Sequence, residues 1–120
     1  MDHSTKGLRV LIVEDEAFVA ALLEDMLETL GCLVAGSAER VPQALEMIDQ
    51  TPCDLVVLDV NVAGERIDPV ARRLDELGRR FIFATGYGSQ GPAVEWRQRP
   101  VLCKPFHIDS LRDAIAAALV

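Results

Sequence analysis

The stretch DLVVLD at residues 54–59 decides the fold class, because four consecutive apolar residues stand between two carboxylates. A strand with one solvated face alternates apolar and polar side chains, whereas a continuous run is typical of a parallel strand covered on both faces. Similar apolar or β-branched runs occur at residues 8–13, 33–36, 80–85 and 101–103. The sequence therefore predicts five buried parallel strands.

Helical patterns fill the segments between these runs and after the last one. In the clearest, residues 17–30 repeat apolar side chains such as Phe18, Leu22 and Leu27 at three- and four-residue steps, and Gly31 follows as a C-terminal glycine. Five strands, each followed by a helix, predict an α/β fold with a doubly wound parallel sheet, a flavodoxin-like (βα)5 three-layer sandwich. The other helices are expected over residues 41–50 and 108–120, with a turn or two within 89–99. A further helix is expected to begin with Asp68 as the N-cap and Pro69 in the first helical position, and to end near Gly78.

Length and charge narrow the function classes. The 120 residues suit one domain, expected as a short tail over 1–7 and a folded unit over 8–120. A net charge of -7 opposes binding to a nucleic-acid backbone. No apolar run approaches the roughly 20 residues of a membrane span, and residues 1–7 lack the apolar stretch of a secretory signal. We therefore expect a cytoplasmic protein without membrane or nucleic-acid partners, with Cys32, Cys53 and Cys103 as reduced, mostly buried thiols.

Polar residues follow four of the five predicted strands. Glu14 and Asp15 come after the first strand, Asp59 ends the third, Thr85 ends the fourth and Lys104 follows the fifth. In a parallel α/β sheet these carboxyl ends meet at the edge where ligands bind. Clustered carboxylates repel one another unless a cation lies among them, and hard oxygen ligands suit Mg²⁺.

This residue set fits phosphoryl transfer. Asp59, at the end of the central run, is the natural nucleophile for forming an acyl phosphate. Mg²⁺, the Lys104 ammonium and the Thr85 hydroxyl would then neutralise charge on the phosphoryl oxygens. Each residue also has an ordinary structural explanation: the acidic pair could begin a helix, Thr85 could lie in a turn, and Lys104 could be a surface lysine. The joint order of the residues favours the functional interpretation.

At these residues the chain resembles the receiver domains of bacterial two-component response regulators. The motifs that carry the resemblance are VLIVEDE at residues 10–16, LVVLDVNVAGE at 55–65, FIFATGYG at 81–88 and LCKPF at 102–106. In this order they cover essentially the whole chain. The FATGYG motif is similar to that of a subgroup of receivers that stand alone, without an output domain.

The resemblance implies transfer of a phosphoryl group from a phosphohistidine of a sensor kinase or a histidine phosphotransfer protein onto Asp59. It also implies that Asp15 binds Mg²⁺ directly, Glu14 binds it through water, and the backbone carbonyl of Asn61 completes the protein ligands with Asp59. Thr85 and Lys104 would hold the phosphoryl oxygens.

The resemblance extends to residues for access and switching. Gly86 would leave room for the phosphoryl donor, and Pro105 would aim the preceding lysine into the site. Many receivers have an aromatic residue where this chain has Val101, so the usual rotating aromatic is absent, and Tyr87 would either gate the site or only cover a loop.

Nothing follows the last predicted helix, so we expect the chain to act by binding a protein target or as a phosphate sink or relay, without an output enzyme. A phosphohydrolase of the haloacid-dehalogenase type is the alternative. That group has a second acid two residues after the nucleophile, and Asn61 at this position disfavours turnover. A flavin-binding module is disfavoured because the loop after the first strand is acidic and would repel a phosphate.

Overall fold

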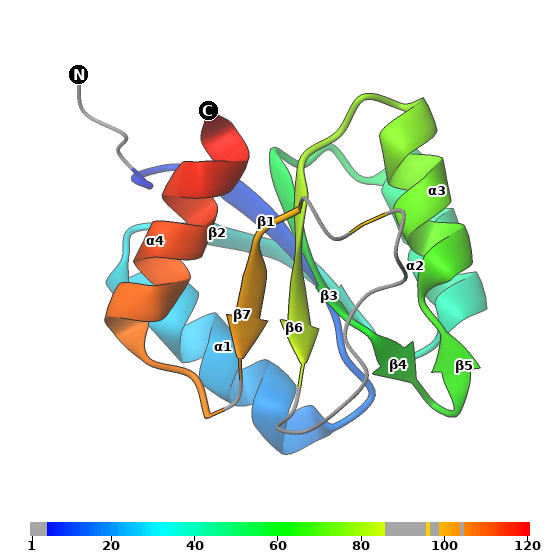
Figure 1. Cartoon of the computed structure of the whole chain (residues 1–120), viewed down its shortest axis with the longest axis horizontal. Coiled ribbons are helices and arrows are strands. Elements are labelled where there is room, and N and C mark those ends of the chain that lie inside the picture. The colour runs from blue at the N-terminus through cyan, green and yellow to red at the C-terminus, as the bar shows by residue number, and fades with distance from the viewer. Residues whose placement is uncertain (1–4, 86–95, 97–98, 104) are drawn as a thin grey trace.

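The computed structural model describes residues 5–85, 96, 99–103 and 105–120. Its main sheet contains β1 (Arg9–Val13), β2 (Leu33–Ala38), β3 (Leu55–Asp59), β6 (Phe81–Thr85) and β7 (Val101–Cys103), in the order β2-β1-β3-β6-β7. All neighbouring strands of this sheet are parallel, as predicted. The order places β3 in the centre, between β1 and β6 (Figure 1).

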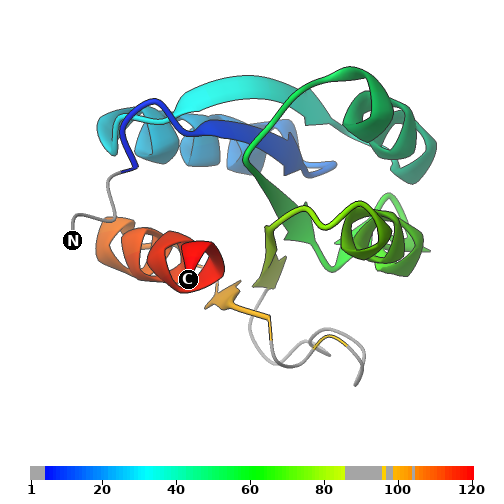
Figure 2. The same ribbon diagram turned by 90° about the horizontal axis from the view of Figure 1, so that it is seen from above.

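The described part of the chain contains four helices. They lie on the two faces of the sheet, which Figure 2 shows from above. Alternate strand residues point to opposite faces, which divides the core into two parts. On one face Leu11, Val56 and Phe83 pack with α2 (Val41–Gln50) and α3 (Asp68–Glu76). On the other, Val10, Val57 and Ile82 pack with α1 (Ala17–Thr29) and α4 (Ile108–Leu119). The predicted three-layer sandwich is confirmed, and the fourth predicted helix, within 89–99, falls mostly outside the described residues.

Two residues predicted at helix ends, Gly31 and Asp68, have different outcomes. Gly31 adopts φ +88° directly after α1, and a Cβ at this position would lie 3.3 Å from Cα of Lys6, so the predicted C-terminal glycine is confirmed. Asp68, predicted as an N-cap, is instead the first residue of α3, and Ile67 occupies the cap position. The Asp68 carboxylate still lies in the first turn, where the helix dipole favours negative charge.

Several predictions of burial are wrong. On α1 the apolar stripe is only partly covered: Leu23 and Leu27 are buried, whereas Phe18 is 79% exposed. The edge strands β2 and β7 are half-exposed because each has a neighbouring strand on one side only. Among the three free cysteines Cys32 alone is buried, Cys53 is half-buried and Cys103 is exposed.

A short antiparallel hairpin, β4 (Asn61–Val62) and β5 (Glu65–Arg66), follows the central strand and was not predicted. Its turn consists of Ala63 and Gly64, with φ values of 53° and 80°. Two positive φ values are typical of the two-residue turn whose twist suits a hairpin, and alanine rarely occupies the first position. The sequence signal was weak because an Asn-Gly or Asp-Gly pair is absent.

Candidate acidic site at the carboxyl edge of the sheet

The central position of β3 brings the predicted site residues together. Asp59 is the last residue of β3 and pairs in register with Ala84 of β6, so Thr85 ends the neighbouring strand one residue further on. Glu14 and Asp15 directly follow β1 on the other side of β3. Glu14, Asp59 and Thr85 are buried at this edge, and Asp15 is exposed. Each side chain reaches the edge because a buried apolar strand ends immediately before or at it.

Glu14, Asp15 and Asp59 form an acidic cluster: one carboxylate oxygen from each lies within 4.8 Å of the other two. Mg²⁺ binds oxygen at about 2.1 Å, so ligands on opposite sides of the ion are about 4.2 Å apart. Small side-chain adjustments would therefore let all three carboxylates approach one ion. Three negative charges at this spacing also repel one another, which favours a bound cation. The donor set fits Mg²⁺, with Asp15 as the ligand nearest to solvent.

The hairpin after β3 is attached to this acidic cluster. The backbone N–H of Ala63 donates a hydrogen bond of 3.0 Å to Oδ2 of Asp15. The Glu14 carboxylate in turn accepts a hydrogen bond of 3.1 Å from the backbone N–H of Glu16. These bonds orient both acids at the edge of the sheet. Ala63 is the site residue that the sequence reasoning missed.

Among the other predicted site residues, the structure describes Asn61, Val101 and Pro105. Asn61 begins β4, with its backbone paired to Arg66. Val101, at the position of the aromatic residue in many receivers, begins β7 and is 39% exposed. Pro105 is also exposed. Gly86, Tyr87 and Lys104, and with them the FATGYG motif beyond Thr85, lie outside the described residues.

An exposed apolar surface lies on the first half of α1, which begins directly after the acidic pair. Phe18 is 79% exposed and Leu22 is 44% exposed. A small cleft of about 170 Å³ lies beside them, lined by Val19, Leu22, Pro105 and Phe106. The loop after β7 thus contributes two apolar side chains to the surface of α1. Apolar residues grouped on an exposed surface are typical of a protein-binding site.

In the part of the chain that the structure describes, none of the helices has the length and apolar character needed to cross a membrane.

Comparisons with known proteins agree with this geometry. Residues 10–116 match the family model described as the response regulator receiver domain. The chain is 28% identical over 116 residues to the chemotaxis protein CheY of Bacillus subtilis, covering 92% of this chain and 97% of that protein. It is 30% identical over 112 residues to sporulation initiation phosphotransferase F of the same organism, covering 89% of this chain and 90% of the relative.

Two solved structures are similar to the chain over nearly its whole length. The solution structure of SdrG from Sphingomonas melonis Fr1 superposes with a TM-score of 0.88 at 41% identity, covering 98% of this chain and 99% of that one. A BeF3-activated conformation of SdrG superposes with a TM-score of 0.81 at 40% identity, covering both chains completely. With a family match over most of its length, the chain belongs to the response regulator receiver domain family.

Proposed function

We propose that the chain accepts a phosphoryl group on Asp59 from a phosphohistidine donor in a Mg²⁺-dependent reaction. The observation that carries the proposal is the Asp59 carboxylate, which ends the central strand, is 9% exposed, and lies within 4.8 Å of the carboxylates of Glu14 and Asp15. An Asp59 oxygen would form a bond to phosphorus while the bond between phosphorus and the donor imidazole nitrogen breaks. The products are an aspartyl phosphate and a free histidine.

The surrounding residues have separate roles in this proposal. Asp15, Glu14 through a water molecule, Asp59 and the backbone carbonyl of Asn61 would hold the Mg²⁺, which neutralises charge on the transferring group. The Thr85 hydroxyl and the Lys104 ammonium would hold the other phosphoryl oxygens. Gly86 would leave space for the donor, with Tyr87, Val101 and Pro105 as the residues around the entrance and the switch. The chain itself would catalyse both its phosphorylation and the later hydrolysis, without an output enzyme.

The partner in the proposal is a sensor histidine kinase or a histidine phosphotransfer protein in the cytoplasm. The exposed Phe18 and Leu22 beside the cleft with Phe106 support it, because a donor that docks there would place its histidine near the acidic cluster. The names of the relatives, a chemotaxis protein and a sporulation phosphotransferase, are consistent with signalling. The receiver domain would span residues 8–120, with 1–7 as a tail, and its phosphorylated state would control a protein target or serve as a phosphate sink or relay.

The test is the intact mass of the protein after incubation with a small acyl-phosphate donor and Mg²⁺. We expect a gain of one phosphoryl group that disappears with a chelator and in Asp59→Asn, which removes the nucleophilic oxygen at nearly constant volume. Asp54→Asn is the matched control, since it makes the same substitution at the residue directly before the same strand. Labelling of Asp59→Asn, or no labelling of the native chain while another receiver consumes the donor, would contradict the proposal.

A second variant tests the role of the lysine. Lys104→Ala is expected to leave Mg²⁺ binding largely intact and to break the signal, because the phosphoryl oxygens lose their cationic partner. Normal control of the target by this variant would contradict that role.

A further inference from the structure

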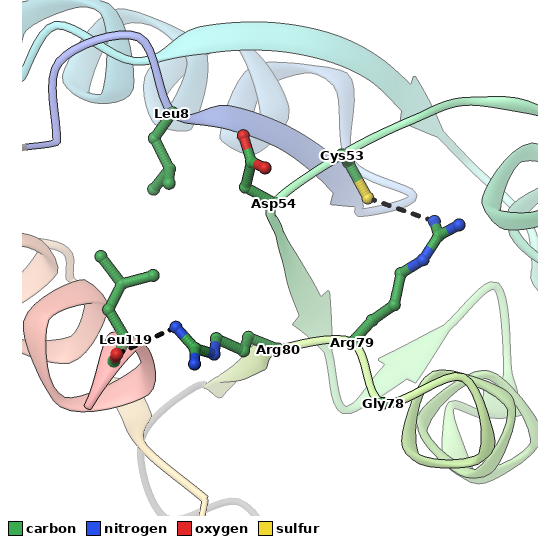
Figure 3. Close-up of a pocket in the computed structure, with 7 residues that line it drawn as sticks. All are labelled: Leu8, Cys53, Asp54, Gly78, Arg79, Arg80 and Leu119. Atoms are coloured by element: carbon green, nitrogen blue, oxygen red, sulfur yellow. Dashed lines mark hydrogen bonds between the residues drawn. The ribbon is translucent and has the colours of Figure 1, made fainter.

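A second cleft, of about 390 Å³, lies at the opposite edge of the sheet from the acidic cluster. It is formed where strands begin rather than end: before β1, before β3 and before β6, together with the last residue of α4. Figure 3 shows its walls. The lining residues are Leu8, Cys53, Asp54, Gly78, Arg79, Arg80 and Leu119. The cleft is therefore separate from the proposed phosphorylation site.

The cleft carries positive charge in an acidic chain. Asp54 is neutralised by Arg9, with an ion-pair distance of 3.3 Å. Arg79 and Arg80 have no carboxylate partner among the residues that the structure describes, in a chain of net charge -7. Burial raises the pKa of the Cys53 thiol, so this group stays neutral at neutral pH and adds no negative charge. Two arginine side chains that have no ion-pair partner among the described residues thus line one cleft.

Hydrogen bonds within the chain use only part of the two guanidinium groups. Nη1 of Arg79 donates to the carbonyl of Ile48, at 3.0 Å, and to Sγ of Cys53, at 3.6 Å. Nη1 of Arg80 donates to the carbonyl of Leu119 at 2.9 Å. These bonds satisfy carbonyls at the ends of α2 and α4, which is the ordinary structural role of such arginines. A guanidinium has five N–H donors, and within the described residues Nε and Nη2 of both side chains make no hydrogen bond.

The two arginines reach opposite ends of the cleft. They are consecutive residues leading into β6, and Figure 3 shows Arg79 extending toward Cys53 and Arg80 extending toward Leu119. Leu8 and Leu119 supply aliphatic wall on the side of the cleft toward which Arg80 extends. A single anion would contact one guanidinium, whereas a molecule with an acidic group at each end would reach both. The volume is in the lower part of the range for small-molecule sites.

From this arrangement we propose that the cleft binds a small dianion, with two carboxylate or phosphate groups joined by a short body, one group at Arg79 and the other at Arg80. Guanidinium groups bind both kinds of acid through paired hydrogen bonds. The bound molecule would join the end of α2, on one face of the sheet, to the end of α4 on the other. The inference is independent of phosphoryl transfer, so Asp59→Asn is expected to bind the ligand as the native chain does.

The test is a titration of the full chain without Mg²⁺, followed through the backbone amide signals in NMR spectra. Succinate and pyrophosphate are the probes for the two acid types, and succinamide is the uncharged analogue of succinate. We expect saturable shifts at Cys53, Asp54, Arg79, Arg80 and Leu119 with at least one dianion and none with succinamide. Shifts confined to other residues, or equal shifts with succinamide, would overturn the proposal.

Variants separate a specific site from general charge attraction. Arg79→Gln/Arg80→Gln is expected to weaken binding at least about tenfold, since charge-assisted hydrogen bonds are lost at both ends. The control Arg40→Gln/Arg112→Gln removes two exposed charges elsewhere, so both variants change the net charge from -7 to -9, and it should bind within about twofold of the native chain.

The single variant Arg80→Gln guards against loss of folding, because Arg80 is exposed and, within the described residues, its side chain makes one hydrogen bond, to the Leu119 carbonyl. It is expected to fold as the native chain does and to bind the dianion more weakly. Unchanged affinity in a folded Arg80→Gln, or equal weakening in the control pair, would refute the site.

Discussion

Asp59→Asn is expected to make the protein more stable when divalent cations are absent. The carboxylates of Glu14, Asp15 and Asp59 lie within 4.8 Å of one another, so the folded chain holds three negative charges together that the unfolded chain keeps apart. Asparagine has nearly the same size and hydrogen-bonding reach as aspartate and carries no charge. The substitution therefore removes two repulsive pairs and changes the packing little.

The distance between the carboxylate oxygens sets the size of the expected change in the free energy of unfolding. At 4.8 Å two unit charges repel by about 0.9 kcal/mol in water and by about 3.5 kcal/mol at the effective dielectric constant of about 20 that suits protein sites. Asp15 is exposed, whereas Glu14 and Asp59 are buried, so the two pairs fall between these limits. Other contacts of the Asp59 carboxylate offset part of the gain. We expect the free energy of unfolding to rise by about 1–3 kcal/mol.

Urea denaturation followed by circular dichroism measures this free energy, with chelator and again with Mg²⁺. The native chain should gain stability from Mg²⁺ because the ion binds the folded state only, and Asp59→Asn should gain less. Asp54→Asn is the control. It removes the same charge directly before β3, where the carboxylate is paired with Arg9, so the stability of this variant should be equal to that of the native chain or lower.

Two outcomes would refute the reasoning. If Asp59→Asn is less stable than the native chain in chelator, repulsion does not dominate at the acidic cluster. If Mg²⁺ stabilises the variant and the native chain equally, Asp59 is not a ligand of the ion.

Two further predictions concern the opposite edge and the core. Hydrogen bonds from the Arg9 side chain and backbone hold the pKa of Asp54 below its ordinary value. The Asp54 carboxylate therefore stabilises the fold at pH values above its pKa in the unfolded chain, and this stabilisation is lost as the pH falls through its pKa in the folded chain. Arg9→Gln should therefore lose less stability on acidification below about pH 4, and an unchanged pH profile would contradict this. Trp96 is buried with its ring 6.0 Å from that of Phe81, so Trp96→Ala should cost about 3–5 kcal/mol in urea denaturation. Trp96→Phe should lower the free energy of unfolding by less than about 1.5 kcal/mol, because it keeps an aromatic ring and removes an indole N–H that lacks a hydrogen bond within the described residues. Equal losses of unfolding free energy in the two variants would contradict a packing role for Trp96.

The architecture could be predicted because each element is encoded locally. Runs such as the one at 54–59 are too apolar to be strands with a solvated face, and the sheet covers β3 on both sides as expected. The hairpin of β4 and β5 could not be predicted in the same way. Its turn contains Ala63, which has a positive φ. The backbone N–H of Ala63 donates a hydrogen bond to Asp15, which is 48 residues away in the sequence, so the reason for this turn conformation is not local.

The periodicity of apolar residues along α1 also predicted only part of the observed burial. A repeat of three and four residues states which side chains share a helix face, but not how much of that face the sheet covers. Leu23 and Leu27 pack in the core against the sheet, whereas Phe18, three residues after Asp15, is exposed to solvent. The exposed part of the stripe is the part that we propose for partner binding.

The parallel α/β fold and the identity of the residues at the carboxyl edge can be read from the amino-acid sequence, because apolar runs specify strands and a residue at the end of a strand must lie at an edge of the sheet. The distances between those residues depend on the folded arrangement of the strands. The strand order places Asp59 between the ends of β1 and β6, and thereby brings three carboxylates within 4.8 Å. It also gathers Arg79, Arg80 and Leu119 around one cleft at the other edge. These contacts join residues far apart in the chain, so their formation depends on strand order and register, which no local pattern encodes.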